Sequence, residues 1–365
     1  MKKFAAVVLI LIAFVSCSFA GEKFRISHQK TYGGIIIKCS IEKFNSLGFE
    51  YGDSVNITFS NGKTLSNIPY YNGYYTKMGE PLLIGYTGRK DIWLQNSYGS
   101  DLWLDLGIGE SDSVIISLNQ RGKYKAIQDA RNIVYVNDRN LYSSDEAFAN
   151  FRAMNLGRLK KNFVYRSASP CNNENNRASY VDKLINLAGV KYIFNLADND
   201  ENIKRFITAS DFDSPYFMKL YENKCVYPAK MSVNFRADSF RSKLAAGLSD
   251  LSKHEGPYLL HCFEGKDRTG FVCMLMGALA GASYDELVND YMLSYANYYG
   301  ITRENEPEKY NVLVSEILDE MLKFVVNDEN VDIRFINLAP YAEKFLLDSG
   351  MSQSDLDALK YRIMN

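Results

Sequence analysis

The stretch HCFEGKDRTG, residues 261–270, separates two apolar segments of the chain. Residues 257–261 predict a buried strand, and residues 269–280 are apolar on every face, which predicts a buried central helix. A charged, glycine-containing segment between two buried elements is expected to form a loop at the edge of the core. A loop that leads into a helix N-terminus is a favourable place to bind an anion.

The predicted loop carries the groups of a nucleophilic phosphate site. Unpaired backbone N–H groups and partial positive charge at the helix N-terminus would cradle a phosphate. The same field would lower the pKa of Cys262 well below about 8.5 and make it an ionised nucleophile. Arg268 would bind the phosphate in a bidentate manner, and Thr269 would donate to the sulfur. The predicted phosphate-binding residues are Phe263, Glu264, Gly265, Lys266, Asp267 and Arg268.

The leaving group needs a proton, and aspartates at two places in the sequence are candidates for the general acid. Asp267 directly precedes Arg268, so it either protonates the leaving group or orients Arg268 through a salt bridge. The other candidate is Asp198 or Asp200, which follow residues 190–196, a predicted buried strand. Asp198 is either the acid or a solvated loop charge. The sequence does not choose between them.

Other polar residues of this region are predicted to orient the loop or to change its charge. His261 is interpreted as a residue that orients the loop and lowers the pKa of Cys262. Lys266 either meets a second phosphate of the substrate or is a solvated lysine that adds positive potential. Glu264 is predicted to point outward, away from the anion, and Arg166 is predicted to support the loop from behind.

The pattern H-C-x5-R-T-G resembles the signature of cysteine-dependent protein tyrosine and dual-specificity phosphatases. Its fuller form, C-x-x-G-K-D-R-T-G, resembles the bacterial secreted phosphatases that act on phosphotyrosine and often on phosphoinositides. Segments similar to that family are NFRAMNLGRLKKNFVYRSASP from residue 150, AGVKYIFNLADNDE from 188, NDYMLSYANY from 289 and AEKFLLDSGMSQSDLDALKYRI from 342. The family's D-L-R reads Asn195-Leu196-Ala197 here, which is a departure.

The resemblance implies a cysteine-phosphatase fold over residues 141–365, with a central, mostly parallel sheet flanked by helices. Alternating strand and helix patterns independently predict an α/β domain. Predicted helices cover 237–253, 308–326, 338–349 and a last stretch from 353, and capping boxes are predicted at Ser143-x-x-Glu146 and Ser283-x-x-Glu286. The resemblance further implies catalysis without a metal or cofactor. Only three histidines and no C-x-x-C pair argue against a zinc site.

Residues 21–140 predict a small all-β, barrel-like domain. Short alternating runs such as 55–59 are separated by glycine turns, and DSVNI at 53–57 is echoed by DSVII at 112–116. The stretch from Gly52 to Tyr86 resembles the C-terminal β-barrel of the SAM hydroxide adenosyltransferase family. Its tyrosines at 70, 71, 74 and 75 either form a carbohydrate- or peptide-binding face or pack on one another; the ligand of this domain stays unknown.

The first twenty residues predict export from a bacterial cell. Lys2 and Lys3 precede a short apolar run, and Ser18-Phe19-Ala20 fits a signal-peptidase site. Alternatively, the segment before Cys17 resembles a lipobox, which would make Cys17 a lipid anchor. Either interpretation gives a periplasmic, secreted or membrane-anchored protein. Cys171 and Cys225 are candidate disulfide partners of Cys262, whereas Cys39 and Cys273 are predicted to be small buried residues.

These features predict a metal-independent phosphatase that acts on phosphotyrosyl proteins through a phosphocysteine intermediate. A phosphoinositide or inositol phosphate substrate is the alternative within the same chemistry. A non-catalytic module that binds phosphorylated ligands is the other alternative. The net charge of −1 argues against a nucleic-acid partner.

Overall fold

The structure is a computed structural model that describes residues 21–364. The predicted signal peptide, residues 1–20, and Cys17 lie outside the described residues. The chain divides into two compact units between Lys125 and Ala126. The change of pattern that the sequence places near residue 140 lies inside the second unit.

The first unit contains a closed barrel with the strand order β1-β2-β6-β5-β4-β3-β7. Its strands are β1 (Glu22–Gln29), β2 (Gly34–Ser40), β3 (Ser54–Phe59), β4 (Thr64–Tyr71), β5 (Pro81–Ile84), β6 (Asp91–Asn96) and β7 (Ser113–Gln120). The barrel is confirmed, but the unit is not purely β. Two short helices, α1 (Ile41–Ser46) and α2 (Leu102–Asp105), place Phe44 and Trp103 in its apolar core.

The repeated DSV sequence corresponds to two paired strands with the same local structure. Strands β3 and β7 lie antiparallel, with Ile57 opposite Ile116. In the turn before β3, Asp53 Oδ2 accepts from the backbone N–H of Glu50 (2.9 Å), three residues earlier. Asp112 Oδ2 accepts from the N–H of Gly109 (2.8 Å) at the equivalent place before β7. The repeat therefore marks an aspartate that closes the turn before each strand.

The tyrosines of the barrel are largely used in packing. Tyr70 and Tyr71 are buried, and the Tyr71 ring lies 5.5 Å from that of Tyr75. The Tyr74 hydroxyl donates to Gln95 Oε1 (2.9 Å). These contacts favour the packing interpretation over an exposed binding face.

The second unit is built on a five-stranded sheet with the order β11-β10-β12-β9-β8. Its strands are β8 (Arg152–Ala153), β9 (Val164–Ser167), β10 (Tyr192–Asn195), β11 (Val226–Pro228) and β12 (Tyr258–His261). Strands β9 to β12 are parallel to one another, and the edge strand β8 pairs antiparallel with β9. The mixed α/β class and the mostly parallel sheet are thus confirmed.

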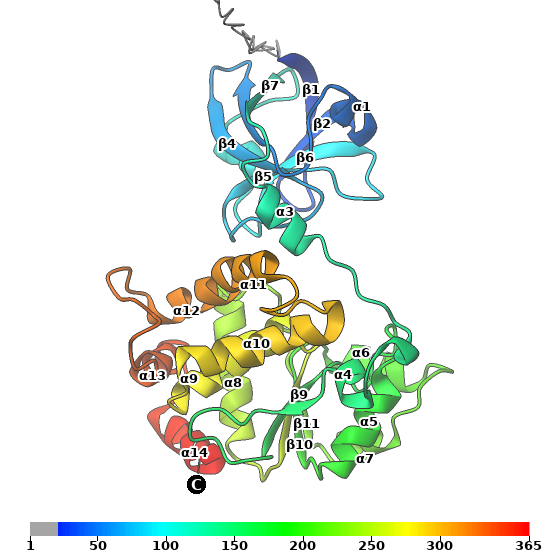
Figure 1. The fold of residues 1–365 in the computed structure, drawn as a ribbon, viewed down its shortest axis with the longest axis vertical. Coiled ribbons are helices and arrows are strands. Elements are labelled where there is room, and N and C mark those ends of the chain that lie inside the picture. The colour runs from blue at the N-terminus through cyan, green and yellow to red at the C-terminus, as the bar shows by residue number, and fades with distance from the viewer. Residues whose placement is uncertain (1–20, 365) are drawn as a thin grey trace, which may run out of the picture. The chain divides into compact units, whose positions relative to one another are not determined.

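Helices cover both faces of this sheet (Figure 1). Leu260 packs with α8 and α9 on one face, whereas its neighbour Leu259 packs with α5 and α7 on the other, since successive strand residues point to opposite faces. Helix α3 (Lys125–Arg131) begins at the last residue of the first unit. The other helices of the second unit are α4 (Asp145–Ala149), α5 (Ala178–Leu187), α6 (Asp200–Ile207), α7 (Pro215–Glu222), α8 (Asp238–Leu251), α9 (Asp267–Leu279), α10 (Tyr284–Tyr299), α11 (Pro307–Leu313), α12 (Asp319–Val326), α13 (Ala339–Asp348) and α14 (Gln353–Met364). Burial on both faces explains why these strands read as continuous apolar runs.

The helix predictions hold, with two local corrections. The capping box of α10 is formed by Ser283 and Glu286, as predicted. The N-cap of α4 is Ser144 rather than Ser143, because the Ser144 hydroxyl accepts from the N–H of Ala147. A π-helical turn, η2 (Val314–Leu318), interrupts the helix predicted over 308–326. Among residues 21–364, none of the helices has both the length and the apolar character needed to cross a membrane.

Candidate active site

The carboxyl ends of the four parallel strands meet at one edge of the sheet, where the loop 262–266 lies. The loops that follow these strands contact one another through their backbones. Ser169 N donates to Phe263 O (3.1 Å), and Leu196 N donates to His261 O (2.9 Å). Because ligands of open α/β sheets bind at this edge, it is the place where a functional site is expected.

Gly265 allows the loop to press against the end of β9. Its φ is +69°, which favours glycine, and a Cβ atom there would lie 2.2 Å from Ser167 O. Helix α9 then begins at Asp267, so the N–H groups of its first turn face the loop. Cys262 is buried, at 3% exposure, at the start of the loop.

Arg268 and Thr269 lie in the first turn of α9. Arg268 Nη1 donates to Met231 O (3.2 Å), and Met231 N donates to Leu196 O (2.8 Å), so the loops after β10 and β11 help to position the guanidinium. Thr269 is fully buried, and its Oγ1 atom has no hydrogen-bond partner among the described residues. An unpaired buried hydroxyl is costly to keep, which points to a functional use.

His261 is buried and neutral. Burial lowers its pKa to about 3, and its Nδ1 lies 3.2 Å from Cys262 O. The neutral ring adds no positive charge beside Cys262 at neutral pH. The contact with the Cys262 carbonyl agrees with a role in orienting the loop.

Asp198 is held beside the loop by Asn195. Asn195 Oδ1 accepts from the N–H groups of Ala197 (2.9 Å) and Asp198 (3.0 Å), and its Nδ2 donates to Asp198 Oδ2 (3.2 Å). Asp198 is 5% exposed, so it is not a solvated loop charge. Burial raises its pKa, although the side-chain hydrogen bonds and the charge of Arg268 oppose this rise. The asparagine that departs from the family pattern thus positions this carboxyl group.

Asp267 has a different environment from Asp198. Its side chain is 52% exposed, and its carboxylate lies 3.9 Å from Lys266 Nζ. The ion pair with Arg268 that the sequence suggested is not among the salt bridges of residues 21–364. Asp267 therefore lies at the rim, and Asp198 lies inside.

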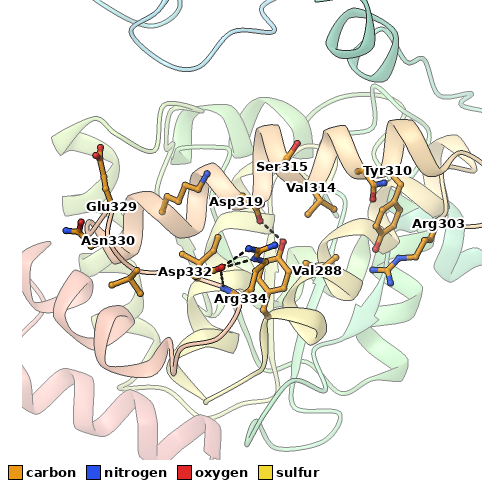
Figure 2. Close-up of a pocket in the computed structure, with 15 residues that line it drawn as sticks. Val288, Arg303, Tyr310, Val314, Ser315, Asp319, Glu329, Asn330, Asp332 and Arg334 are labelled. Atoms are coloured by element: carbon orange, nitrogen blue, oxygen red, sulfur yellow. Dashed lines mark hydrogen bonds and ion pairs between the residues drawn. The ribbon is translucent and has the colours of Figure 1, made fainter.

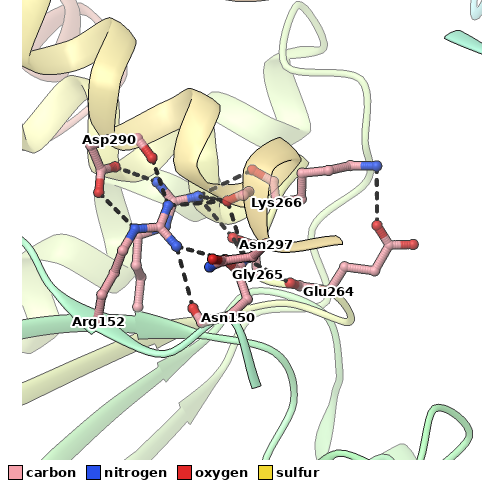
Figure 3. Close-up of polar contacts among 9 residues, drawn as sticks. Asn150, Arg152, Glu264, Gly265, Lys266, Asp290 and Asn297 are labelled. Carbon is pink, nitrogen blue, oxygen red and sulfur yellow. Dashed lines mark hydrogen bonds and ion pairs between the residues drawn. The ribbon is translucent and has the colours of Figure 1, made fainter. Parts of the chain in front are cut away.

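Glu264 and Lys266 differ from what the sequence predicted. Glu264 Oε2 lies 3.1 Å from Lys266 Nζ, and Tyr135 donates to Glu264 Oε1 (3.1 Å), so Glu264 is held in place rather than pointing freely outward. Lys266 is 13% exposed and donates to the Tyr299 hydroxyl (2.9 Å), so it is not a solvated lysine. Figure 3 shows the ion pair extending from the loop.

Arg166 supports the loop from behind, as predicted. Its Nη2 atom donates to Gly265 O (2.8 Å), and its Nη1 atom pairs with Asp290 Oδ2 (2.5 Å). Arg152 binds the other oxygen of Asp290 (3.0 Å), as Figure 3 shows. Burial opposes ionisation of Asp290, but the two arginines outweigh burial and hold its pKa below the usual range.

Three further loop-supporting residues carry no role in the sequence analysis. Asn150 Nδ2 donates to Glu264 O (3.2 Å) and Gly265 O (3.3 Å), and Asn297 donates to Asn150 Oδ1 (3.1 Å). The Tyr298 hydroxyl donates to Glu264 O (2.7 Å). These residues lie in the segments from residues 150 and 289 that resemble the family, but the resemblance assigned them no function.

The comparisons with known proteins agree with this geometry. The sequence model of a tyrosine phosphatase family matches residues 147–365. The chain belongs to the tyrosine phosphatase family. No curated protein matches it. A solved structure that matches is the crystal structure of an uncharacterized conserved protein from Thermotoga maritima, at 16% identity and a TM-score of 0.23. The match covers 26% of this chain and 35% of that chain, and it supports no conclusion about fold or activity.

The described cysteines of the phosphatase, Cys39, Cys171, Cys225, Cys262 and Cys273, are all free. Cys39 and Cys273 are buried, as predicted, and burial raises the pKa of the Cys273 thiol to about 12. A disulfide between Cys262 and Cys171 or Cys225 is therefore not formed in this structure.

A separate groove of about 620 Å³ lies among the helices of the phosphatase unit (Figure 2). In it, Tyr284 donates to Asp319 (2.7 Å) and Arg334 pairs with Asp332 (2.6 Å). Its lining residues lie between 284 and 334, so this groove is distinct from the loop that carries Cys262.

Gly265→Ala should lower the rate of phosphate release by displacing the loop. The added Cβ atom would collide with Ser167 O, and a misplacement of about 1 Å costs roughly 10²-fold in rate. Gly189→Ala is the matched control, because Gly189 has a similar φ of +63° but open space around its Cβ position. Phosphate release by the two purified variants checks this, and equal activities would contradict it.

Asp290→Ala should destabilise the phosphatase unit strongly. It would leave Arg152 and Arg166 buried without their carboxylate, and breaking a buried ion pair costs about 3–5 kcal/mol. Urea unfolding measures the loss. Asp348→Ala is the control, since Asp348 pairs with Lys344 at the exposed surface and should change stability by less than about 1 kcal/mol. A loss as small as that of the control would contradict a structural role for Asp290.

Proposed function

We propose that this phosphatase hydrolyses phosphotyrosine in proteins without a metal ion, through a phosphocysteine intermediate. The observation that supports this proposal most is the position of Cys262. It follows a buried strand and begins the loop that leads into a buried helix, whose first turn carries Arg268. An anion placed among the N–H groups of this loop would meet both the nucleophile and the guanidinium.

In the first step the Cys262 thiolate attacks phosphorus, and an S–P bond forms as the bond to the phenolic oxygen breaks. The N–H groups of residues 263–268 and Arg268 hold the equatorial oxygens and stabilise the charge that develops on them. Asp198 gives its proton to the leaving oxygen. Its raised pKa suits this task, because a general acid must keep its proton near the working pH.

In the second step water attacks the phosphocysteine. Asp198, now ionised, accepts a proton from the water, and the thiolate of Cys262 leaves as inorganic phosphate is released. The unpaired hydroxyl of Thr269 donates to the departing sulfur and makes it a better leaving group. Asp267 contributes from the rim of the loop, where its exposed carboxylate adds less to proton transfer than Asp198 does.

Release of phosphate from a phosphotyrosyl peptide, in the presence of reductant and EDTA, tests this proposal. We expect turnover that EDTA does not reduce, together with an acid-stable phosphorylated enzyme trapped by rapid quenching. Absence of turnover in the reduced protein would contradict the proposed activity. Tight binding of the peptide without turnover would instead support a non-catalytic binding module.

The proposed site of action is outside the cytoplasm, since residues 1–20 have the pattern of an export signal. The intact mass of the mature protein distinguishes the two routes of processing. A chain that begins at Gly21 indicates signal-peptidase cleavage, and a chain that begins at a lipidated Cys17 indicates a lipoprotein.

A further inference from the structure

We propose that Glu264 restricts this site to substrates with a single phosphate, because its ion pair with Lys266 removes the cation that would bind a second one. The proposal rests on the function proposed above and names the substrate class: phosphate monoesters without a second, neighbouring phosphate. It chooses phosphotyrosine over inositol compounds that carry two adjacent phosphates.

The first step of the argument is that Lys266 is fully engaged. Its Nζ atom lies 3.1 Å from Glu264 Oε2, donates to the Tyr299 hydroxyl (2.9 Å), and lies 5.2 Å from the Tyr299 ring centre and 5.5 Å from that of Tyr295. Burial alone would lower its pKa, but Asp267, Tyr295 and Glu264 outweigh burial and keep it well above the usual value. Lys266 is therefore charged, enclosed and already neutralised.

The second step is that Glu264 is fixed in the position that neutralises Lys266. The Tyr135 hydroxyl donates to its carboxylate, and the Tyr298 hydroxyl and the Asn150 amide donate to its backbone carbonyl. The Tyr135 hydroxyl also accepts from Asn175 (2.9 Å), so the contact with Glu264 belongs to a larger network. Because both the carboxylate and the backbone carbonyl of Glu264 accept hydrogen bonds, we expect the carboxylate to stay beside Lys266 when an anion approaches.

The third step is electrostatic. A second phosphate near Lys266 would meet the pair rather than a free cation, and it would lie close to the negative charge of Glu264. Like charges that lie close together in a partly buried site repel strongly, because water screens them less there than in bulk solvent. A phenyl ring carrying one phosphate brings no second anion and is not subject to this repulsion.

Competition by soluble inositol phosphates tests the proposal. The probes are inositol 4-phosphate and inositol 4,5-bisphosphate, and the readout is the ratio of their inhibition constants against hydrolysis of a phosphotyrosyl peptide. In the wild type we expect no preference for the bisphosphate. Glu264→Gln keeps an acceptor for Tyr135 but removes the charge, and we expect it to shift the ratio about tenfold towards the bisphosphate.

Two further variants separate charge from structure. In the Glu264→Gln background, Lys266→Met should abolish the gain, because the cation that Glu264→Gln makes available is then absent. Glu255→Gln is the control for loss of one negative charge elsewhere, since Glu255 pairs with Lys191 at the exposed surface. It should not move the ratio.

A wild type that binds the bisphosphate at least tenfold more tightly than the monophosphate, or a gain in Glu264→Gln that survives Lys266→Met, would overturn the proposal. An unchanged ratio in Glu264→Gln would also overturn it. If the wild type does not hydrolyse the peptide, the proposed function fails, and calorimetric binding of the two probes to the same proteins still decides the role of Glu264. The two failures are therefore distinguishable.

Discussion

Cys262→Ser should lower phosphate release from a phosphotyrosyl peptide by at least about 10⁴-fold, which is the scale of losing a catalytic nucleophile. A serine hydroxyl is a much weaker nucleophile than a thiolate at neutral pH, and the helix N-terminus does not ionise it. Serine is similar in size to cysteine, so we expect the buried backbone after β12 to keep its conformation in this variant. Initial rates with reductant present measure the effect.

The same variant should still bind the phosphorylated peptide, because Arg268 and the loop N–H groups remain. Cys225→Ser is the matched control. Cys225 is a free, partly buried cysteine whose sulfur lies 3.5 Å from Asn223 O, and its replacement should change the rate by less than about twofold. Activity in Cys262→Ser close to that of Cys225→Ser would rule out the phosphocysteine mechanism.

Asp198→Asn should lower kcat for the peptide by about 10²- to 10⁴-fold, the usual contribution of a general acid. The loss should be smaller with an aryl phosphate whose leaving group is less basic, because that oxygen needs a proton less. Asn195 can still hold the amide that replaces the carboxyl group, so the fold should be kept. Steady-state kinetics with both substrates checks the difference.

The pH dependence provides a second readout for Asp198. A general acid works in its protonated form, so kcat falls as the pH rises through its pKa. Burial raises this pKa, which moves the falling limb of the profile towards neutral pH. In Asp198→Asn this limb should disappear.

Asp267→Asn is the comparison that decides between the two candidates. Its carboxylate is half exposed and lies 3.9 Å from Lys266 Nζ, so we expect a loss of less than about tenfold and an unchanged alkaline limb. If Asp267→Asn instead removed the limb and Asp198→Asn did not, the assignment of the general acid would be reversed.

Much of the fold follows from local patterns in the sequence. Alternation at 55–59 and burial on both faces at 257–261 predict a barrel strand and a parallel-sheet strand, and both are found. The sequence placed the N-cap of α4 at Ser143, whereas the structure has it at Ser144. Two adjacent serines are equally good N-caps by sequence, and only the backbone conformation distinguishes them. The helices of the barrel were missed because they are only four to six residues long.

The sequence by itself determined the nucleophile, the arginine and the loop that joins them, because all three lie within seven consecutive residues and their spacing is local. Only the tertiary structure decided which aspartate is enclosed, that Glu264 neutralises Lys266, and that Asn150 holds the loop. The contacts that fix Glu264 come from residues far along the chain: Asn150 and Tyr135 lie 114 and 129 positions from it. Parallel strands bring such segments to one edge of the sheet, and no local pattern records which side chains then meet.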